Sequence, residues 1–274
     1  MNIAQARNNL FEEIVDIYAT GNLEARVNAI REAAQVIALA GLHRGGFFTD
    51  AAFYGGTCQR IFYNLDRFSE DLDFSLLKPA DRFDFSKYYS AIQREFELVG
   101  FPITIEEKKK KAGSTIHMAL LKVKYDKSFI RVKIEIDVNP PPRFDTEYKL
   151  SMLPYSFMAK CYTPSSSFAA KMDAVLFRGW RNRVKGRDWY DFEWYTRNGV
   201  VLDLAHLNER AKLFKRAMID FTEISLRDFL KKKIMTIDID SARNDVLPFI
   251  NEPGKLDIWS RDYFQQVAEL MKVG

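Results

Sequence analysis

The sequence predicts an α+β fold followed by a helical half, and three observations lead to this prediction. Apolar residues recur at helical spacing in residues 22–41, with Asn22 as the expected N-cap and Gly41 as the expected stop. Short alternating segments between residues 51 and 138 are typical of strands. Beyond about residue 165 the pattern is almost wholly helical. A sheet with flanking helices, followed by a helical domain, is the architecture that fits this order.

The first half alternates strands with helices. Residues 51–56 predict a short strand that runs into a glycine turn, and Thr57 is expected to start a helix through about Asn64. A further helix is expected over residues 85–100, ending at Gly100. The remaining expected strands are 71–77, 103–108, 115–125 and 129–138. The last two flank a turn-like Asp-Lys-Ser and predict an antiparallel hairpin.

We place the domain boundary near residue 150. Residues 1–150 are then one domain with an N-terminal helical extension, and residues 151–274 are a helical domain. The segment Asn-Pro-Pro-Pro that begins at Asn139 ends the last long strand before this boundary.

The composition argues against several classes of protein. The chain has 274 residues, 47% of them hydrophobic, so a sizeable core can form. No apolar run approaches the roughly 20 residues of a membrane helix, and the N-terminus lacks the layout of a secretory signal. We therefore expect a cytoplasmic protein with no membrane partner. Cys58 and Cys161 show no CxxC spacing, which argues against a zinc site or a disulfide framework.

The charge distribution is mildly basic. The formal net charge is +4, and lysine runs occupy residues 108–111 and 231–233. Such runs are usually solvated, but they are also compatible with a nucleic-acid partner.

The segment Tyr-Gly-Gly-Thr is a candidate phosphate site. Gly55 and Gly56 stand where a strand meets a helix, so the backbone there can approach a ligand closely. The first N–H groups of the helix are unpaired and favour phosphate oxygens. Thr57 can cap the helix and also donate its hydroxyl to a phosphate. A merely structural turn is the alternative.

Two acids follow on the next strand. Strand alternation puts Asp71 and Asp73 on one face and Leu72 and Phe74 on the other. Like charges so close disfavour each other's ionised form unless a cation lies between them. A divalent cation such as Mg²⁺, or Mn²⁺ in its place, prefers such oxygen ligands. A surface strand that exposes two acids to water is the alternative.

A third carboxylate is expected from a neighbouring strand. Glu135 and Asp137 share one strand face and both remain candidates, either as a metal ligand or as a base. The alternative is an amphipathic strand with Lys133 and both acids in water.

The segments Gly-Gly-Thr and Arg-Phe-Ser-Glu-Asp-Leu-Asp-Phe together resemble the first motif of the AbiEii-type nucleotidyltransferases. That family contains the toxins of type IV, abortive-infection toxin–antitoxin systems, and it belongs to the polymerase-β-like nucleotidyltransferase superfamily. The resemblance implies a mixed sheet with flanking helices. The residues that carry it are Arg60, Arg67, Ser69, Asp71 and Asp73. It implies nucleotide binding for Arg60 and Ser69 beside the glycine turn.

A second block, from Ser167 to Tyr195, is similar to the family's lysine helix and its following Arg-Asp helix. Lys171 matches the family's lysine, and Arg187, Asp188 and Asp191 match its RDxxD segment. The resemblance implies catalytic roles for Lys171 and Asp188. It implies nucleotide contacts for Lys171, Arg187 and Asp191. An ordinary ion-pair surface is the alternative for the aspartates.

The expected function is therefore that of a metal-dependent nucleotidyltransferase toxin. The resemblance implies an NTP substrate, an RNA acceptor with the 3′ end of tRNA favoured, and a cognate AbiEi-like antitoxin. Two alternatives stay open. One is a non-catalytic regulator that binds GTP or ATP, and the other is a nucleotidyltransferase that modifies a protein or a small molecule.

Overall fold

The computed structural model describes residues 11–12, 15–16, 23–108, 114–125, 128–152, 156–178, 184–214 and 220–274. The chain divides into two compact units. The first unit comprises Met1–Pro140 and Thr146–Cys161, and the second comprises Pro141–Asp145 and Tyr162–Gly274. The domain boundary expected near residue 150 stays a prediction.

The first unit is built on a seven-stranded sheet in the order β3-β4-β5-β2-β1-β7-β6. β1 pairs antiparallel with β2 and parallel with β7, while β2 pairs parallel with β5. β3, β4 and β5 form an antiparallel series, so the expected hairpin is confirmed. The strands are β1 Ala51–Tyr54, β2 Asp71–Leu76, β3 Ile103–Lys108, β4 Ile116–Tyr125, β5 Ser128–Asp137, β6 Thr146–Ser151 and β7 Phe157–Tyr162. β6 and β7 were not expected from the sequence.

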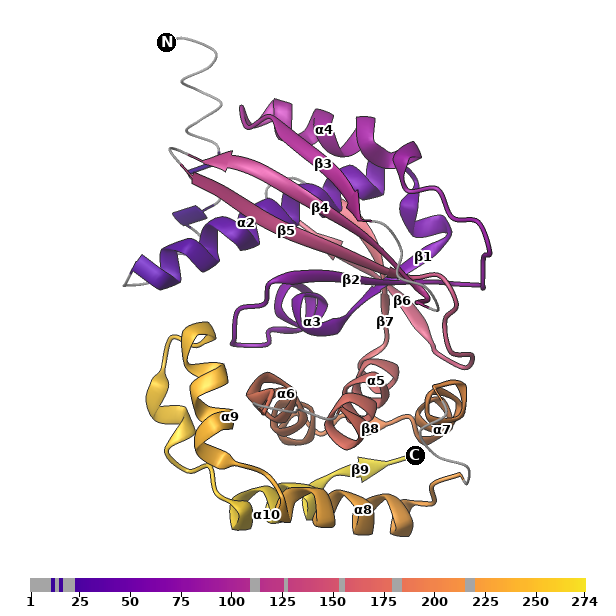
Figure 1. The fold of residues 1–274 in the computed structure, drawn as a ribbon, viewed down its shortest axis with the longest axis vertical. Helices are drawn as coiled ribbons and strands as arrows, with labels where there is room; N and C mark the ends of the chain where they lie inside the picture. The colour runs from indigo at the N-terminus through magenta and orange to yellow at the C-terminus, as the bar shows by residue number, and fades with distance from the viewer. Residues whose placement is uncertain are drawn as a thin grey trace. The chain divides into compact units, whose positions relative to one another are not determined.

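Helices cover one face of this sheet (Figure 1). They are α2 Leu23–Arg44, α3 Gly55–Tyr63 and α4 Tyr89–Leu98, with short 3₁₀ turns at Phe47–Thr49 and Ser86–Tyr88. The expected stop at Gly41 is wrong, because α2 continues to Arg44. A Cβ on Gly41 would lie 2.6 Å from the Cα of Ile92, so this glycine lets α2 and α4 pack closely. Asn22, the expected cap, lies outside the described residues.

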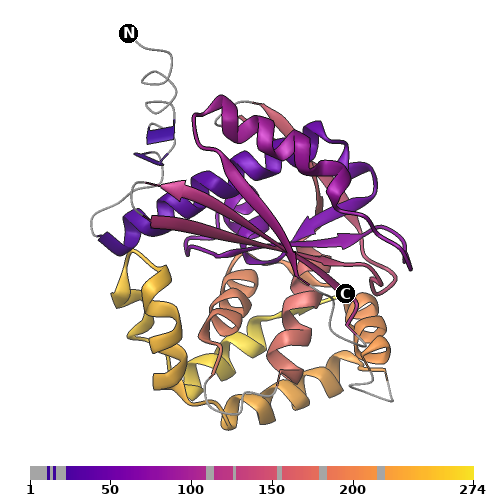
Figure 2. The same cartoon turned by 45° about the horizontal axis from the view of Figure 1, so that its top comes forward.

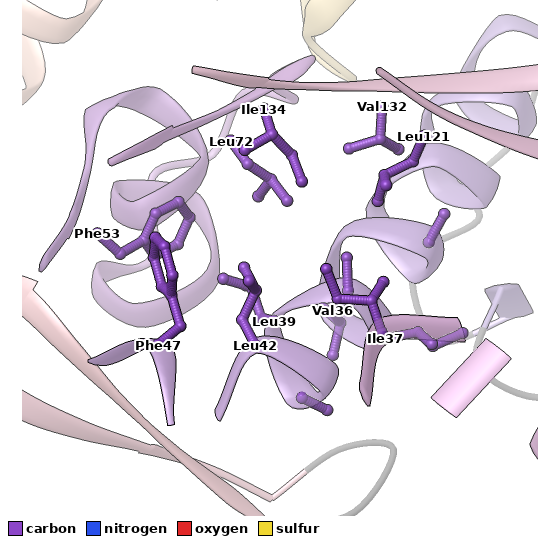
Figure 3. Packing of buried hydrophobic residues seen from close by; sticks show 14 of the residues in the cluster. Val36, Ile37, Leu39, Leu42, Phe47, Phe53, Leu72, Leu121, Val132 and Ile134 are labelled. Carbon is purple, nitrogen blue, oxygen red and sulfur yellow. The ribbon is translucent and has the colours of Figure 1, made fainter. Parts of the chain in front are cut away.

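The core of the first unit lies between α2 and the sheet. Val36 and Leu39 of α2 face Leu72 of β2 and Ile134 of β5 (Figure 3). All four side chains are fully buried. The sheet therefore has one apolar face towards the helices, and the residues between the buried ones point to the opposite face.

The second unit is helical, as expected (Figure 2). Its helices are α5 Pro164–Phe177, α6 Gly186–Arg197, α7 Leu204–Leu213, α8 Glu223–Met235, α9 Ile239–Val246 and α10 Arg261–Leu270, with 3₁₀ turns at Leu247–Phe249 and Pro253–Leu256. Two short strands, β8 Val201–Leu202 between α6 and α7 and β9 Lys272–Val273 after α10, pair in parallel. Phe168 of α5 stacks on Tyr195 of α6 with ring centroids 4.8 Å apart, and both rings are buried. Within the described residues, none of the helices has the length and apolar content that crossing a membrane requires.

Candidate active site

The open face of the sheet carries acidic side chains on two paired strands. Leu72 and Phe74 of β2 are fully buried, so Asp71 and Asp73 alternate to the open face. In the parallel pairing of β2 with β5, Asp73 is the register partner of Glu135. The alternation expected from the sequence is confirmed on both strands. Three carboxylates from neighbouring strands therefore share one face.

A lysine lies among these acids. Lys133 is the register partner of Asp71, and its Nζ lies 3.0 Å from Oδ2 of Asp71 and 3.2 Å from Oε1 of Glu135. Partial burial acts to lower the pKa of Lys133, but the two carboxylates outweigh it and the pKa rises above its ordinary value. The acidic face thus holds an ammonium ion of its own. Sequence reasoning considered Lys133 only as a solvated residue, because its partner on β2 depends on the strand register.

Asp137 differs from Glu135. Its register partner is Ser75, two pairs further along β2 than Asp73. The Asp137 carboxylate is buried, and its Oδ1 accepts a hydrogen bond from the backbone N–H of Asn139 at 3.1 Å. Glu135 is therefore the acid that directly faces the pair on β2, whereas Asp137 also fixes the turn that ends β5.

The glycine turn touches the same acids. Gly55 has φ +81°, and a Cβ there would lie 2.5 Å from Oδ2 of Asp73. A Cβ on Gly56 would lie 2.6 Å from Nη2 of Arg67 and 2.8 Å from Oγ of Ser69. Both glycines are therefore needed for the close approach of side chains from the segment 67–73.

The N-terminal end of α3 differs from the expectation for Thr57. The helix begins at Gly55, two residues earlier, and its N-cap Tyr54 makes no side-chain capping bond. The expected cap at Thr57 is wrong, because Thr57 lies inside the helix. Its buried hydroxyl donates to the carbonyl oxygen of Asp71 at 2.5 Å and so ties α3 to the start of β2.

The carboxylates supply the donor chemistry of a divalent-cation site. Within the described parts of the chain, no three His, Cys, Asp or Glu side chains are arranged to hold a metal ion. The Lys133 ammonium lies against Asp71 and Glu135 instead. The oxygen donors of Asp71, Asp73 and Glu135 are those that a hard cation such as Mg²⁺ prefers, and the ammonium would have to move aside for one to bind.

The second unit holds a buried charge network. Nζ of Lys171 on α5 lies 2.8 Å from Oδ1 of Asp188 and 2.8 Å from Oδ2 of Asp191, both on α6. Nη1 of Arg178 lies 3.1 Å from Oδ2 of Asp188. Burial acts to raise the pKa of Asp188, but Lys171 and Arg178 outweigh it and lower that pKa to about 2. The lysine and both aspartates expected from the sequence are thus brought together.

A model of the family described as "Nucleotidyl transferase AbiEii toxin, Type IV TA system" matches residues 37–269. This match spans most of both units. The chain belongs to the AbiEii nucleotidyltransferase toxin family. It is accordingly a nucleotidyltransferase enzyme, and the resemblance found in the sequence is confirmed.

Solved structures show the same fold as this AbiEii-family chain. A "putative nucleotidyltransferase from H. pylori" is 20% identical, with a TM-score of 0.52, and the match covers 88% of this chain and 92% of that one. JHP933 from Helicobacter pylori is 19% identical, with a TM-score of 0.51, and the match covers 89% of this chain and 90% of that one. The mixed sheet with flanking helices and the helical C-terminal region are thereby confirmed. No curated protein matches the chain.

Two arginines of the AbiEii motifs are engaged in contacts within their own units. Nε of Arg60 lies 3.1 Å from Oε2 of Glu32, its Nη1 donates to the carbonyl of Leu65 at 3.2 Å, and its guanidinium lies over the ring of Phe68. Arg187 lies over the ring of Phe249, 4.1 Å from its centroid, and its backbone N–H donates to Asp245. The nucleotide contacts expected for both residues stay predictions.

Other residues of this AbiEii-family site have structural roles that the motif did not assign. Arg67 is buried, and its Nη1 donates to the carbonyl of Phe68 at 2.9 Å. Nε2 of Gln35 on α2 donates to the carbonyls of Ser69 and Glu70 at 3.0 Å and 2.9 Å. The helix that precedes the glycine turn therefore holds the segment leading into Asp71. The sequence signal that could have identified Gln35 is that it is the one polar side chain in the apolar run 33–42.

Proposed function

We propose that this toxin transfers a nucleotide from an NTP to the 3′ end of tRNA, with Mg²⁺ or Mn²⁺ as cofactor. The single observation that carries the proposal is the acidic face of β2 and β5 in contact with the glycine turn. Oδ2 of Asp73 lies within 2.5 Å of where a Gly55 Cβ would stand, so a phosphate on the first N–H groups of α3 would lie next to the acids. Asp71 and Asp73 would hold the cation.

The reaction is a displacement at the α-phosphorus. The acceptor hydroxyl oxygen forms a bond to the α-phosphorus, the bond from that phosphorus to the bridging α–β oxygen breaks, and pyrophosphate leaves with the bond's electron pair. Glu135 accepts the hydroxyl proton as general base, since it faces Asp73 across the strand pair. A bound Mg²⁺ would neutralise charge that develops on the phosphoryl oxygens.

The chain's own groups would position the triphosphate. The backbone N–H groups of Gly55, Gly56 and Thr57 begin α3 and suit phosphate oxygens. The Thr57 hydroxyl is committed to the Asp71 carbonyl, so Thr57 contributes through its backbone. The Ser69 hydroxyl stands beside Gly56, in the segment that leads into β2, and would donate to a phosphate oxygen.

The toxin–antitoxin family supports further parts of the proposal. We infer that the chain acts in the cytoplasm, where NTPs and tRNA are present, and that an AbiEi-like antitoxin counteracts it. The formal net charge of +4 is compatible with an RNA acceptor. Of the lysine runs, Lys108 ends β3, residues 109–113 lie outside the described parts, and Lys231 on α8 pairs with Glu269 at 2.5 Å.

The test uses the full chain with each NTP labelled at the α-phosphate, Mg²⁺ and purified tRNA. The proposal expects label on tRNA from at least one NTP, and none from the same NTP labelled at the γ-phosphate. Periodate oxidation of the tRNA 3′ diol removes the acceptor hydroxyl and should abolish the transfer. Label on the protein would overturn the tRNA assignment in favour of a protein-modifying enzyme. Nucleotide binding with no transfer from any NTP to any acceptor would favour the regulator.

A further inference from the structure

Lys133 is fixed on the acidic face by the alternation of β5. Val132 and Ile134 on either side of it are fully buried, so the lysine points to the open face. The register places it opposite Asp71, two residues from Glu135 on its own strand. Its Nζ touches both carboxylates, at 3.0 Å and 3.2 Å.

The ammonium occupies oxygens that a divalent cation would need. An oxygen in contact with an ammonium ion can bind a metal only if the two cations sit close together, and they repel each other. The metal and the ammonium therefore compete. Lys133 can yield the position, because its side chain is 32% exposed and its four-carbon stem is flexible.

The triphosphate of a bound nucleotide would provide new contacts for the displaced Lys133 ammonium. The glycine turn at Gly55 lies against Asp73, which shares its strand face with Asp71. A phosphate bound there would offer the ammonium new anionic oxygens within reach of the same face.

We propose that Lys133 is an internal counter-cation that occupies the acidic face until a nucleotide arrives, so that divalent-cation binding depends on nucleotide binding. The identity of the two ligands rests on the proposed function. Lys133 is a positioning residue in this scheme, and it acts through Asp71 and Glu135. By linkage, metal and nucleotide must then strengthen each other's binding by the same factor.

The experiment measures Mn²⁺ binding by the loss of the free-ion electron paramagnetic resonance signal. Wild type, Lys133→Met, Lys133→Arg and Lys122→Met are titrated with and without a nucleoside α,β-methylene triphosphate, and the analogue alone is the blank. Lys122 on β4 is the matched control. Its Nζ lies 2.5 Å from Oε1 of Glu106 on β3, and neither strand pairs with β2. Thermal unfolding confirms that each variant is folded.

Without nucleotide, Lys133→Met should bind Mn²⁺ at least about tenfold more tightly than wild type, and the analogue should add less further affinity. Lys133→Arg and Lys122→Met should behave as wild type. Adding Asp73→Asn to Lys133→Met should remove the gain. Unchanged or weaker Mn²⁺ binding in Lys133→Met, an equal gain in Lys122→Met, or no Mn²⁺ binding in either protein would overturn the inference.

The two proposals fail separately. A gain in Mn²⁺ affinity without any nucleotide transfer by wild type would overturn the proposed reaction and leave the counter-cation intact. Transfer by wild type with no gain in Lys133→Met would overturn the counter-cation alone.

Discussion

Asp73 leaves no room for a side chain on Gly55. A Cβ on this glycine would lie 2.5 Å from Oδ2 of Asp73, and the backbone has φ +81°, a region that favours glycine. The start of α3 and the acid of β2 are therefore in direct contact. Any ligand bound at the first turn of α3 meets the acidic face.

Gly55→Ala should damage both stability and transfer. The positive φ alone costs about 1 to 3 kcal/mol, and the added methyl must push Asp73 away from its position. We expect unfolding at lower denaturant concentration and at least about a tenfold loss of kcat/KM for nucleotide transfer. Gly254→Ala is the control, because the nearest atom to its Cβ is 3.8 Å away. A Gly55→Ala protein with wild-type stability and rate would contradict the close contact.

Glu135 and Asp137 should respond differently to neutralisation. Glu135→Gln removes the carboxylate that faces Asp73 and should lower kcat/KM by about 10²- to 10⁴-fold. Asp137→Asn keeps an oxygen that can accept from the N–H of Asn139, so its effect should be below about tenfold. Rates of label transfer in the two variants decide between them. A larger loss in Asp137→Asn would assign the third carboxylate to that residue.

Lys171 should be required for the stability of the second unit. Lys171→Met leaves Asp188 and Asp191 buried with their shared ammonium removed. Breaking a buried pair in this way costs about 3 to 5 kcal/mol. Lys212→Met is the control, because Lys212 is half exposed, as is its partner Asp220, and exposed pairs contribute at most about 1 kcal/mol. Denaturant unfolding measures both. Equal stability of the two variants would show that the Lys171 network is not structural.

His206 should make the second unit less stable in mild acid. Burial, with the nearby Arg210, lowers the pKa of His206 from 6.5 to about 4, and its Nδ1 contacts the carbonyl of Pro142. Between these two values the unfolded chain binds a proton that the folded chain does not, so unfolding becomes easier as pH falls from 6.5 to 4. The whole change is on the order of 3 kcal/mol.

Unfolding free energies between pH 4 and 7 test this for wild type and His206→Asn. The variant should lose most of the slope in that window, whereas His43→Asn should keep it. The same slope in His206→Asn as in wild type would rule out His206 as its source.

Strand positions in the first unit were predictable because alternation is a local property. The faces of β2 and β5 follow from buried Leu72, Phe74 and Ile134 between polar residues. β6 was missed because its alternation is misleading: Tyr148 and Leu150 are apolar but exposed. Gly41 was misjudged as a helix stop because its reason for being glycine is tertiary, the contact with Ile92.

The candidate site was predictable in composition and less so in its connections. The two aspartates and the glycine turn are close in sequence, so their contact follows from one short strand–helix–strand unit. The partner of Lys133 and the hydrogen bonds of Gln35 join segments far apart in the chain, and only strand register and helix packing determine them. Thr57 was given a cap role because the helix was expected to start two residues later than it does.

The most direct test of the account is the transfer of α-phosphate label from NTP to tRNA by Asp73→Asn. Asp240→Asn serves as control, because Asp240 is exposed on α9 and pairs only with its helix neighbour Arg243 in the described contacts. We expect Asp73→Asn to fold with a wild-type unfolding temperature and to lose at least about 10³-fold in rate. Asp240→Asn should transfer at the wild-type rate. A folded Asp73→Asn protein that transfers label as fast as wild type would show that the reaction does not occur at the acidic face of β2 and β5.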